Sequence, residues 1–337
     1  MLTVPRPRRS SELRPPAPAP DRALEAARNV GPDAVTLTGP VGTRYVGDGG
    51  PYVIAHRGGA ALARENTLAA FDRSYALGVR YLETDVRMTS DGECVAVHDA
   101  TLTRVTGAEA RVDELTLSGI RRLGIGGDRV LRIADLLATF ESAKFVFDLK
   151  DPKALPHLVA LLHRAGATDR VCLAGARDRW LLAARELAGP ALNTALGWEA
   201  VGRLVIAAKA GRRPVNLPPA EFVHLPRTLG RRKLLTRRVV DIAHDLGMRV
   251  MAWDVEDADA MHQMLDIGVD GLITDRPDLA RDVLVERDAW VAPTAWPAPE
   301  KPVQGAEQEK RTMARARRLL SRGVASQGAA SQGVVAP

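Results

Sequence analysis

Charged side chains suited to phosphate chemistry follow an apolar run near the start of the sequence. Residues 52–55 form a short apolar run that ends abruptly at His56 and Arg57, which indicates a buried strand that delivers a charged pair to a loop. In the next predicted strand, the period of two places Glu83 and Asp85 on one face. Two inward carboxylates repel each other, and burying them unpaired would be costly. A hard cation with oxygen ligands, Mg²⁺ or Ca²⁺, is therefore the expected partner.

The same region contains the other groups that cleavage of a phosphodiester requires: a base, an acid and positive charge on the phosphate oxygens. His56 and a second histidine, His98, can exchange protons near neutral pH. Arg57 offers a planar fork to a phosphate, and Lys150 supplies a point charge. These residues leave open which histidine is the acid. They also leave open whether the nucleophile is water or an adjacent hydroxyl group of the substrate, which would give a cyclic phosphate.

Asp148 lies at the end of another predicted strand and shares a face with Lys150. Two interpretations follow from this placement. Asp148 could join Glu83 and Asp85 as a third carboxylate ligand of a divalent cation that keeps waters or substrate oxygens in its other positions. Alternatively, Asp148 and Lys150 could form an ordinary ion pair at a strand end.

Five linked motifs resemble the glycerophosphodiester phosphodiesterase family in their order and spacing. They are His56-Arg57-Gly58, Glu65-Asn66-Thr67, Glu83-x-Asp85, Thr89-x-Asp91-Gly92 and His98-Asp99-x-x-Leu102-x-Arg104-x-Thr106. The resemblance continues near the C-terminal end, in Trp253-Asp254-Val255 and in residues 268–277. It therefore covers about residues 51–286.

The resemblance implies a metal-dependent phosphodiesterase that releases an alcohol and sn-glycerol 3-phosphate, and it implies a role for each matching residue. The catalytic histidines are His56 and His98, the metal carboxylates are Glu83, Asp85 and Asp148, and the phosphate-binding cations are Arg57 and Lys150. Trp253 is expected to contact the substrate, while Glu65 and Asn66 are expected to support the loop that carries His56.

Two departures from the family's pattern concern the substrate. Position 148 is Asp where the family usually has Glu, and similar barrels of the sphingomyelinase D type have Asp there. The residues after Trp253 are Asp-Val-Glu rather than Thr-Val-Asn. One alternative is therefore a phospholipase D-like enzyme that acts on lysolipids or sphingolipids. Another is a catalytically silent barrel that serves as a binding module, although a binding role would not require both histidines.

The elements that must position these residues are repeated strand and helix units. Eight such units favour a (β/α)₈ barrel, whose active site lies at the C-terminal ends of the strands. A doubly wound open sheet is the alternative, but it would not gather polar residues at four separate strand ends. The predicted strands are residues 52–55, 81–87, 145–149, 170–173, 193–196, 215–217, 249–253 and 271–274.

Two features interrupt this regular pattern. The sixth strand is ambiguous, because the proline-rich segment around residues 215–226 offers a second candidate at 222–225. A short hairpin is expected between residues 86–88 and 94–97, across a turn that contains Asp91 and Gly92. The hairpin would carry His98 over the barrel mouth, and Asp91 is interpreted as a turn residue.

Composition divides the 337 residues into one domain and two tails. Residues 1–50, rich in Pro and Arg, and residues 287–337, rich in Pro, Ala, Gln, Ser and Gly, are expected to be largely disordered. The first segment has 7 Arg against 5 acidic residues and the second has 8 basic against 4 acidic residues. The tails therefore account for the whole net charge of +6, and the barrel of residues 51–286 is neutral.

A neutral domain argues against a nucleic-acid partner, since a basic footprint should lie on the folded surface. The expected partner is a small phosphodiester. A possible basic helix at residues 312–320 could make weak contact with an anionic membrane. No apolar run is long enough for a membrane span or a signal peptide, which predicts a cytoplasmic protein. The two cysteines, Cys94 and Cys172, are interpreted as small buried hydrophobic residues.

Overall fold

A computed structural model describes residues 45–46, 49–125 and 127–291 of the chain. In this part, eight parallel strands follow one another in the order β6-β5-β4-β2-β1-β11-β10-β7. Their bounds are β1 Tyr52–Ala55, β2 Tyr81–Met88, β4 Lys144–Leu149, β5 Val171–Gly175, β6 Asn193–Thr194, β7 Phe222–Pro226, β10 Arg249–Trp253 and β11 Gly271–Thr274.

The two ends of this strand order meet and close the sheet into a barrel. Ala195, just after β6, forms a parallel bridge with Phe222 of β7. The backbone N–H of Leu196 donates to the Phe222 carbonyl at 2.9 Å, and that of Glu221 donates to the Thr194 carbonyl at 3.0 Å. The predicted (β/α)₈ fold is thus confirmed.

The sixth strand is Phe222–Pro226, so its placement at residues 215–217 was wrong. Asn216 has a positive φ of 56°, and Val215 is 72% exposed. A residue with positive φ cannot continue a strand. The second candidate segment instead alternates as a strand should: Val223 and Leu225 pack in the helix-facing core, while Phe222 and His224 face the barrel interior.

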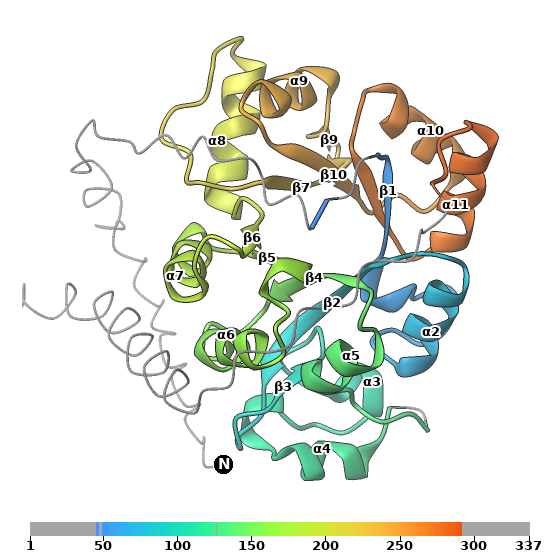
Figure 1. The fold of residues 1–337 in the computed structure, drawn as a ribbon, viewed down its shortest axis with the longest axis vertical. Helices are drawn as coiled ribbons and strands as arrows, with labels where there is room; N and C mark the ends of the chain where they lie inside the picture. Colours follow the sequence, from blue (N-terminus) through green and yellow to red (C-terminus); the bar gives the residue numbers. More distant parts are fainter. Residues whose placement is uncertain (1–44, 47–48, 126, 292–337) are drawn as a thin grey trace, which may run out of the picture. The chain divides into compact units, whose positions relative to one another are not determined.

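Helices surround the strands, as Figure 1 shows. Those that follow barrel strands are α2 Leu68–Ala76, α6 Ala154–Arg164, α7 Asp178–Ala188, α8 Trp198–Lys209, α9 Arg237–Asp245, α10 Ala258–Asp266 and α11 Pro277–Glu286. No helix among the described residues is long and apolar enough to span a bilayer.

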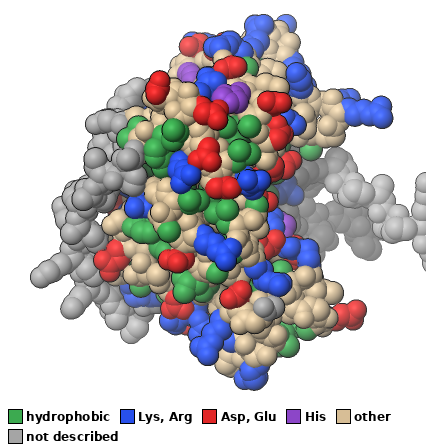
Figure 2. Space-filling model, turned by 90° about the vertical axis from the view of Figure 1, so that its right-hand side faces the viewer, with side chains coloured by type: hydrophobic (Ala, Val, Ile, Leu, Met, Phe, Trp, Pro, Cys, Tyr) green, Lys and Arg blue, Asp and Glu red, His purple; other side chains and the backbone are tan. Residues whose placement is uncertain are grey.

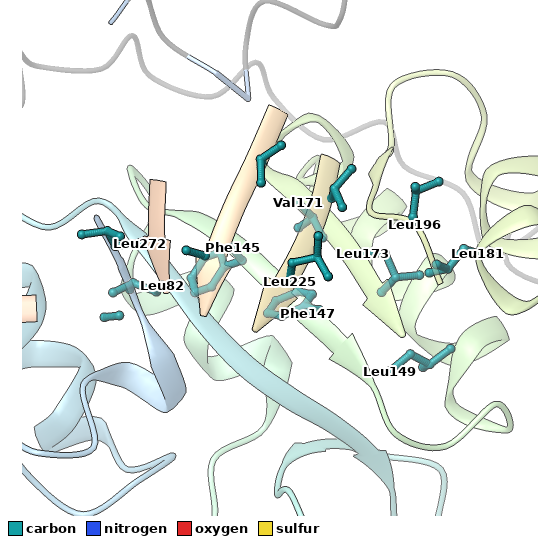
Figure 3. Packing of buried hydrophobic residues seen from close by; sticks show 14 of the residues in the cluster. Leu82, Phe145, Phe147, Leu149, Val171, Leu173, Leu181, Leu196, Leu225 and Leu272 are labelled. Carbon is teal, nitrogen blue, oxygen red and sulfur yellow. The ribbon is translucent and has the colours of Figure 1, made fainter. Parts of the chain in front are cut away.

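The strand period of two separates the helix-facing core from the barrel interior. Phe145 and Phe147 stack on the outer face of β4, with ring centroids 5.3 Å apart, and belong to the helix-facing core, which also contains leucines from other strands and from α7 (Figure 3). Each fully buried side chain of this kind contributes about 1.5–3 kcal/mol. Val146 and Asp148, the alternate residues of β4, face inward, so the same packing that fixes the outer face also aims Asp148 at the interior.

The predicted hairpin is present between β2 and β3, Cys94–Ala96, which pair antiparallel. Thr89 donates its hydroxyl proton to Asp91 at 2.5 Å, and the backbone N–H of Leu117 also donates to that carboxylate at 3.0 Å. These bonds give Asp91 the turn role expected of it. The hairpin covers a separate buried cluster together with α3 Thr103–Thr106, η3 Val112–Glu114 and α4 Leu117–Leu123, whereas α5 Ile133–Thr139 packs in the helix-facing core.

The folded part begins earlier than residue 51. Tyr45 and Val46 are buried in the barrel interior, and the Tyr45 hydroxyl donates to the Phe145 carbonyl at 3.2 Å. Tyr45 also packs edge-on against Tyr81 and Phe222, with centroids 5.7 and 5.4 Å away. At the other end, the region predicted as a tail includes residues 287–291 of the described chain. The predicted basic helix at 312–320 lies outside the described residues.

Figure 2 shows one face of the molecule, where Lys and Arg side chains alternate with Asp and Glu instead of forming one basic stripe. Interspersed charges give no single-sign field to attract a polyanion. This is the surface expected of a neutral barrel, and the absence of a nucleic-acid partner stays a prediction.

Candidate active site

A cavity of about 310 Å³ opens at the C-terminal ends of the strands. This is the end of a (β/α)₈ barrel at which active sites form. Every residue predicted to act in catalysis, metal binding or substrate binding lines it: His56, Arg57, Glu83, Asp85, His98, Asp148, Lys150 and Trp253.

The loop after β1 holds His56 and Arg57 in an unusual backbone conformation. Arg57 has φ 49° and ψ 34°, a left-handed backbone conformation that residues other than glycine rarely adopt. It directs the backbone N–H of Arg57 to Glu83 Oε2 at 2.7 Å. Two residues further on, Gly59 has a φ of 95°, and a Cβ there would lie 2.5 Å from the Ser74 hydroxyl, so this position requires glycine.

β2 provides two buried carboxylates. Glu83 and Asp85 are 5% and 1% exposed. Asn66, which also has a positive φ of 57°, donates its amide to Asp85 Oδ2 at 3.3 Å and accepts the Thr84 hydroxyl proton at 2.7 Å. The predicted supporting residue Asn66 therefore contacts Asp85, a predicted metal ligand, directly.

β4 contributes Asp148 beside them, and Lys150 follows directly after the strand. Asp85 and Asp148 are register partners on adjacent parallel strands. Lys150 Nζ lies 2.6 Å from Asp148 Oδ2 and 3.2 Å from Asp85 Oδ1. The ion pair that was the alternative interpretation of Asp148 is thus present, and it includes Asp85 as well.

His98 reaches the cavity from the end of the hairpin and is held by a chain of ion pairs. Its Nδ1 lies 2.7 Å from Asp99 Oδ1. Arg104 donates Nε–H to Asp99 Oδ2 at 2.6 Å and binds both carboxylate oxygens of Glu65 at 2.7 and 2.8 Å. Glu65 in turn accepts Arg57 Nη1 at 3.1 and 3.2 Å. This network joins the loop of His98 to the loop of His56.

His56 is oriented by a residue from the opposite end of the sequence. Its Nδ1 lies 2.8 Å from Asp275 Oδ1, just after β11. Its Nε2 lies 3.9 Å from Glu83 Oε2. Burial lowers the pKa of His56, but the negative charges of Glu83 and Asp275 outweigh burial and raise it from 6.5 to about 9.

The carboxylates carry more negative charge than their neighbours compensate. Burial, and then repulsion from Asp85, raise the pKa of Glu83 to about 7. The pKa of Asp85 is lowered even though burial opposes this, because Lys150 and Arg57 are close. Arg57 Nε lies 3.4 Å from Asp85 Oδ2, yet it is buried without a hydrogen bond to the described residues.

This donor set suits a hard divalent cation. Three carboxylates from adjacent strands face one cavity, and a buried carboxyl with a raised pKa lacks compensating charge. As the side chains stand in the described part of the chain, no three His, Cys, Asp or Glu residues converge closely enough to coordinate one ion. Lys150 occupies the position between Asp85 and Asp148 instead.

The opposite side of the cavity is apolar and aromatic. Trp180 of α7, Trp198 of α8 and Trp253 of β10 line it, and together they are called the aromatic wall below. The rings of Trp198 and Trp253 meet nearly at right angles, 74°, with centroids 6.3 Å apart. His224 of β7 lies between this wall and the barrel interior.

Comparison with known proteins assigns this site to a family. A sequence model of the glycerophosphoryl diester phosphodiesterase family matches residues 56–279. The "Probable glycerophosphodiester phosphodiesterase 2" of Mycobacterium tuberculosis is 34% identical over 254 residues, which cover 73% of this chain and 95% of that protein. The chain belongs to the glycerophosphoryl diester phosphodiesterase family. The predicted enzyme class, a phosphoric diester hydrolase, is thereby confirmed.

Solved structures agree with this family assignment in their fold. A crystal structure of a protein from Silicibacter pomeroyi has a TM-score of 0.62 at 25% identity, and the match covers 74% of this chain and 98% of that one. A phosphodiesterase from Oleispira antarctica, solved with the product sn-glycerol-3-phosphate, has a TM-score of 0.58 at 17% identity. The match covers 70% of this chain and 97% of that one.

Several residues of this family member's site were not predicted. Asp275 lies in a motif that carried the family resemblance, but nothing in the sequence ties it to His56, 219 residues earlier. Trp180 and Trp198 occupy the first turns of helices, where no periodic pattern marks a cavity. His224 faces the cavity because the sixth strand lies at Phe222–Pro226 and not at residues 215–217.

Proposed function

We propose that the chain hydrolyses glycerophosphodiesters to an alcohol and sn-glycerol 3-phosphate, with His56 and His98 as the proton-transfer pair and a divalent cation held by Glu83, Asp85 and Asp148. The observation that carries this proposal is that each histidine has a carboxylate on Nδ1, at 2.8 and 2.7 Å. Such a partner fixes the ring and leaves Nε2 for proton transfer. Both rings line one cavity with the three carboxylates.

The phosphate would bind on the charged side of the cavity. The buried Arg57 Nε has no hydrogen-bond partner among the described residues, and a phosphate oxygen would supply the acceptor. Bound Mg²⁺ or Ca²⁺ would offset the charge of the carboxylates and stabilise negative charge on the phosphate oxygens. Lys150 would then exchange its contact with Asp85 for one with the substrate.

The reaction requires two proton transfers by the chain's own residues. One histidine removes a proton from the nucleophile, which is water or an adjacent substrate hydroxyl, as its oxygen bonds to phosphorus. The bond from phosphorus to the leaving oxygen breaks, and the other histidine protonates that oxygen. Where the nucleophile is the substrate hydroxyl, the product of this step is a cyclic phosphate, and a water activated by the second histidine then opens it while the first histidine returns its proton to the ring oxygen. Asp275 and Asp99 stabilise whichever ring is protonated at each stage.

The test is release of glycerol 3-phosphate from a panel of glycerophosphodiesters by the full chain, followed with a glycerol 3-phosphate dehydrogenase. Activity should vanish in EDTA and return when Mg²⁺ or Ca²⁺ is added back. Full turnover in metal-free buffer would overturn the metal proposal and leave the hydrolase proposal in place.

Product analysis separates the rival activity in the same experiment. A phospholipase D-like enzyme would act on lysophospholipids or sphingolipids and would release no glycerol 3-phosphate. Turnover of those lipids with no turnover of any glycerophosphodiester would therefore replace the proposed function by its alternative.

A further inference from the structure

The aromatic wall occupies the half of the barrel mouth that the proposed chemistry does not use. Three of the chain's five tryptophans gather on this side of one cavity. They come from β10 or from the helices that directly follow β5 and β6, whereas the proton-transfer and carboxylate residues come from β1, β2 and β4 or their ends and from the end of the hairpin strand β3. A diester whose phosphate binds on the charged side would extend one of its two alcohol groups toward the tryptophans.

The wall is held in place by contacts between the starts of α7 and α8. Gly197 precedes Trp198, and a Cβ at Gly197 would lie 2.5 Å from the backbone nitrogen of Asp178. Glu199 accepts that same backbone N–H at 3.0 Å and pairs with Arg177 at 3.0 Å. The helix that carries Trp180 is thus fixed against the helix that carries Trp198 before any ligand binds.

The tryptophan rings remain accessible. Trp198 is 44% exposed, and Trp180 and Trp253 are partly exposed. Apolar indole surface that is exposed to water is unfavourable in free energy, and a ligand that covers this surface removes that penalty.

Charge on this side favours a cation. Arg57 and Lys150 are the only Arg and Lys side chains that line the cavity within the described chain, and both lie on the charged side. Burial lowers the pKa of His224 to about 4, so this histidine is neutral at pH 7. Asp254, which directly follows Trp253, is exposed, and neither a hydrogen bond nor an ion pair joins its carboxylate to another described residue.

We propose that the aromatic wall binds a quaternary ammonium group on the leaving alcohol, so that the preferred substrate is a choline ester of glycerol phosphate. This inference rests on the proposed function. Indole faces attract a trimethylammonium group through their negative quadrupole, and Trp is the strongest of the aromatic side chains in this respect. The cavity of about 310 Å³ suits a small head group, since it also has to admit the phosphate and the glycerol.

The test compares two diesters that differ only in charge: glycerophosphocholine, and its isostere in which a tert-butyl group replaces the trimethylammonium. The wild-type chain should show a kcat/KM about tenfold higher for the choline ester. Trp198→Leu and Trp253→Leu, which keep apolar area but remove the π face, should bring this ratio close to one. Trp198→Phe should retain most of the preference.

Each variant's kcat/KM for glycerophosphoglycerol serves as an internal control for folding and chemistry, and it should change less than the choline ratio does. A wild-type ratio near one, or a ratio that survives both leucine substitutions, would overturn the quaternary ammonium site while the hydrolase proposal stands. A preference for long-chain lysolipids that the leucine variants keep would show an apolar site instead.

Binding of choline itself, followed by tryptophan fluorescence against uncharged 3,3-dimethylbutanol, separates this inference from the proposed function. If no diester is hydrolysed but choline still binds and Trp198→Leu weakens it, the aromatic site holds and the proposed function fails. If choline and the uncharged alcohol bind equally well, the proposed quaternary ammonium site is overturned, whether or not the chain hydrolyses any diester.

Discussion

The two halves of the barrel mouth are built in different ways. On the side of β11, β1, β2 and β4, polar residues are held by charged partners far away in sequence, and two of them, Arg57 and Asn66, have positive φ. On the side of β5, β6, β7 and β10, the tryptophans are positioned by helix starts and packing. Substitutions on the first side should therefore change the rate of the chemistry, and those on the second should change the choice of substrate.

The largest expected effect is on proton transfer. His56→Ala and His98→Ala should each lower kcat by about 10² to 10⁴-fold. The double variant should lose much less than the product of the two, since both histidines act in one cycle. Near-normal turnover by His98→Ala on a diester with a poor leaving group would remove His98 from the chemistry.

Asp85→Asn should lower kcat by about 10² to 10³-fold, because it removes the negative charge of Asp85, which lies between the carboxylates of Glu83 and Asp148. It should also weaken activation by Mg²⁺ or Ca²⁺ in a titration. Asp91→Asn is the matched control, since Asp91 serves the hairpin turn, and its rate should stay within about twofold of wild type. Equal losses in the two variants would contradict the difference between site and turn.

A smaller loss is expected from the ion pairs that join the two histidine loops. Arg104→Ala should lower kcat by about 10 to 100-fold, because it releases Asp99 and Glu65 together. The pH profile of kcat should shift as well, since Asp99 would no longer be held on His98. Arg111→Ala, which removes another exposed ion pair in the same loop region, is the control. An unchanged pH profile in Arg104→Ala would reduce this arginine to a structural role.

The smallest effect concerns stability on the charged side. Burial raises the pKa of the Glu65 carboxyl. Hydrogen bonds from Arg104 and the charge of Arg57 outweigh burial and hold this pKa below its usual 4.5. A carboxyl with a lowered folded-state pKa stabilises the fold above its unfolded pKa and loses this contribution as pH falls. Glu65→Gln should therefore lower the free energy of unfolding by about 1 kcal/mol at pH 7.

The difference between wild type and Glu65→Gln should shrink once the pH falls below 4.5, as urea unfolding at several pH values would show. Glu114→Gln is the control, because Glu114 is 68% exposed and should show little difference at any pH. On the opposite side, Trp198→Leu should change stability by the same amount at both ends of this pH range. A difference in unfolding free energy that stayed constant with pH would show that the charge of Glu65 does not contribute to the stability of the fold.

The charged side could be predicted from the sequence because its chemistry lies at strand ends. The period of two places Glu83 and Asp85 together, and the turn residues place His56 and His98 in loops. Their partners could not be predicted in the same way, because the contact of His56 with Asp275 depends on closure of the barrel between its first and last strands.

The aromatic side was harder to predict for a physical reason. A tryptophan at the first turn of a helix gives the same pattern whether it faces solvent, core or cavity. The sixth strand was misplaced because two short segments had similar composition, and the left-handed conformation of Asn216 was not visible in the sequence. That error also hid His224, whose inward direction depends on strand register.

Tyr45 marks a boundary of practical importance. Its ring fills the barrel interior at the N-terminal ends of the strands, and its backbone carbonyl accepts a hydrogen bond from the Tyr81 hydroxyl at 2.9 Å. Tyr45 therefore closes the end of the barrel opposite the cavity. A domain excised at the first strand would leave that end open to water. Anyone who fuses, truncates or circularly permutes this barrel should therefore retain Tyr45 and not begin the domain at Tyr52.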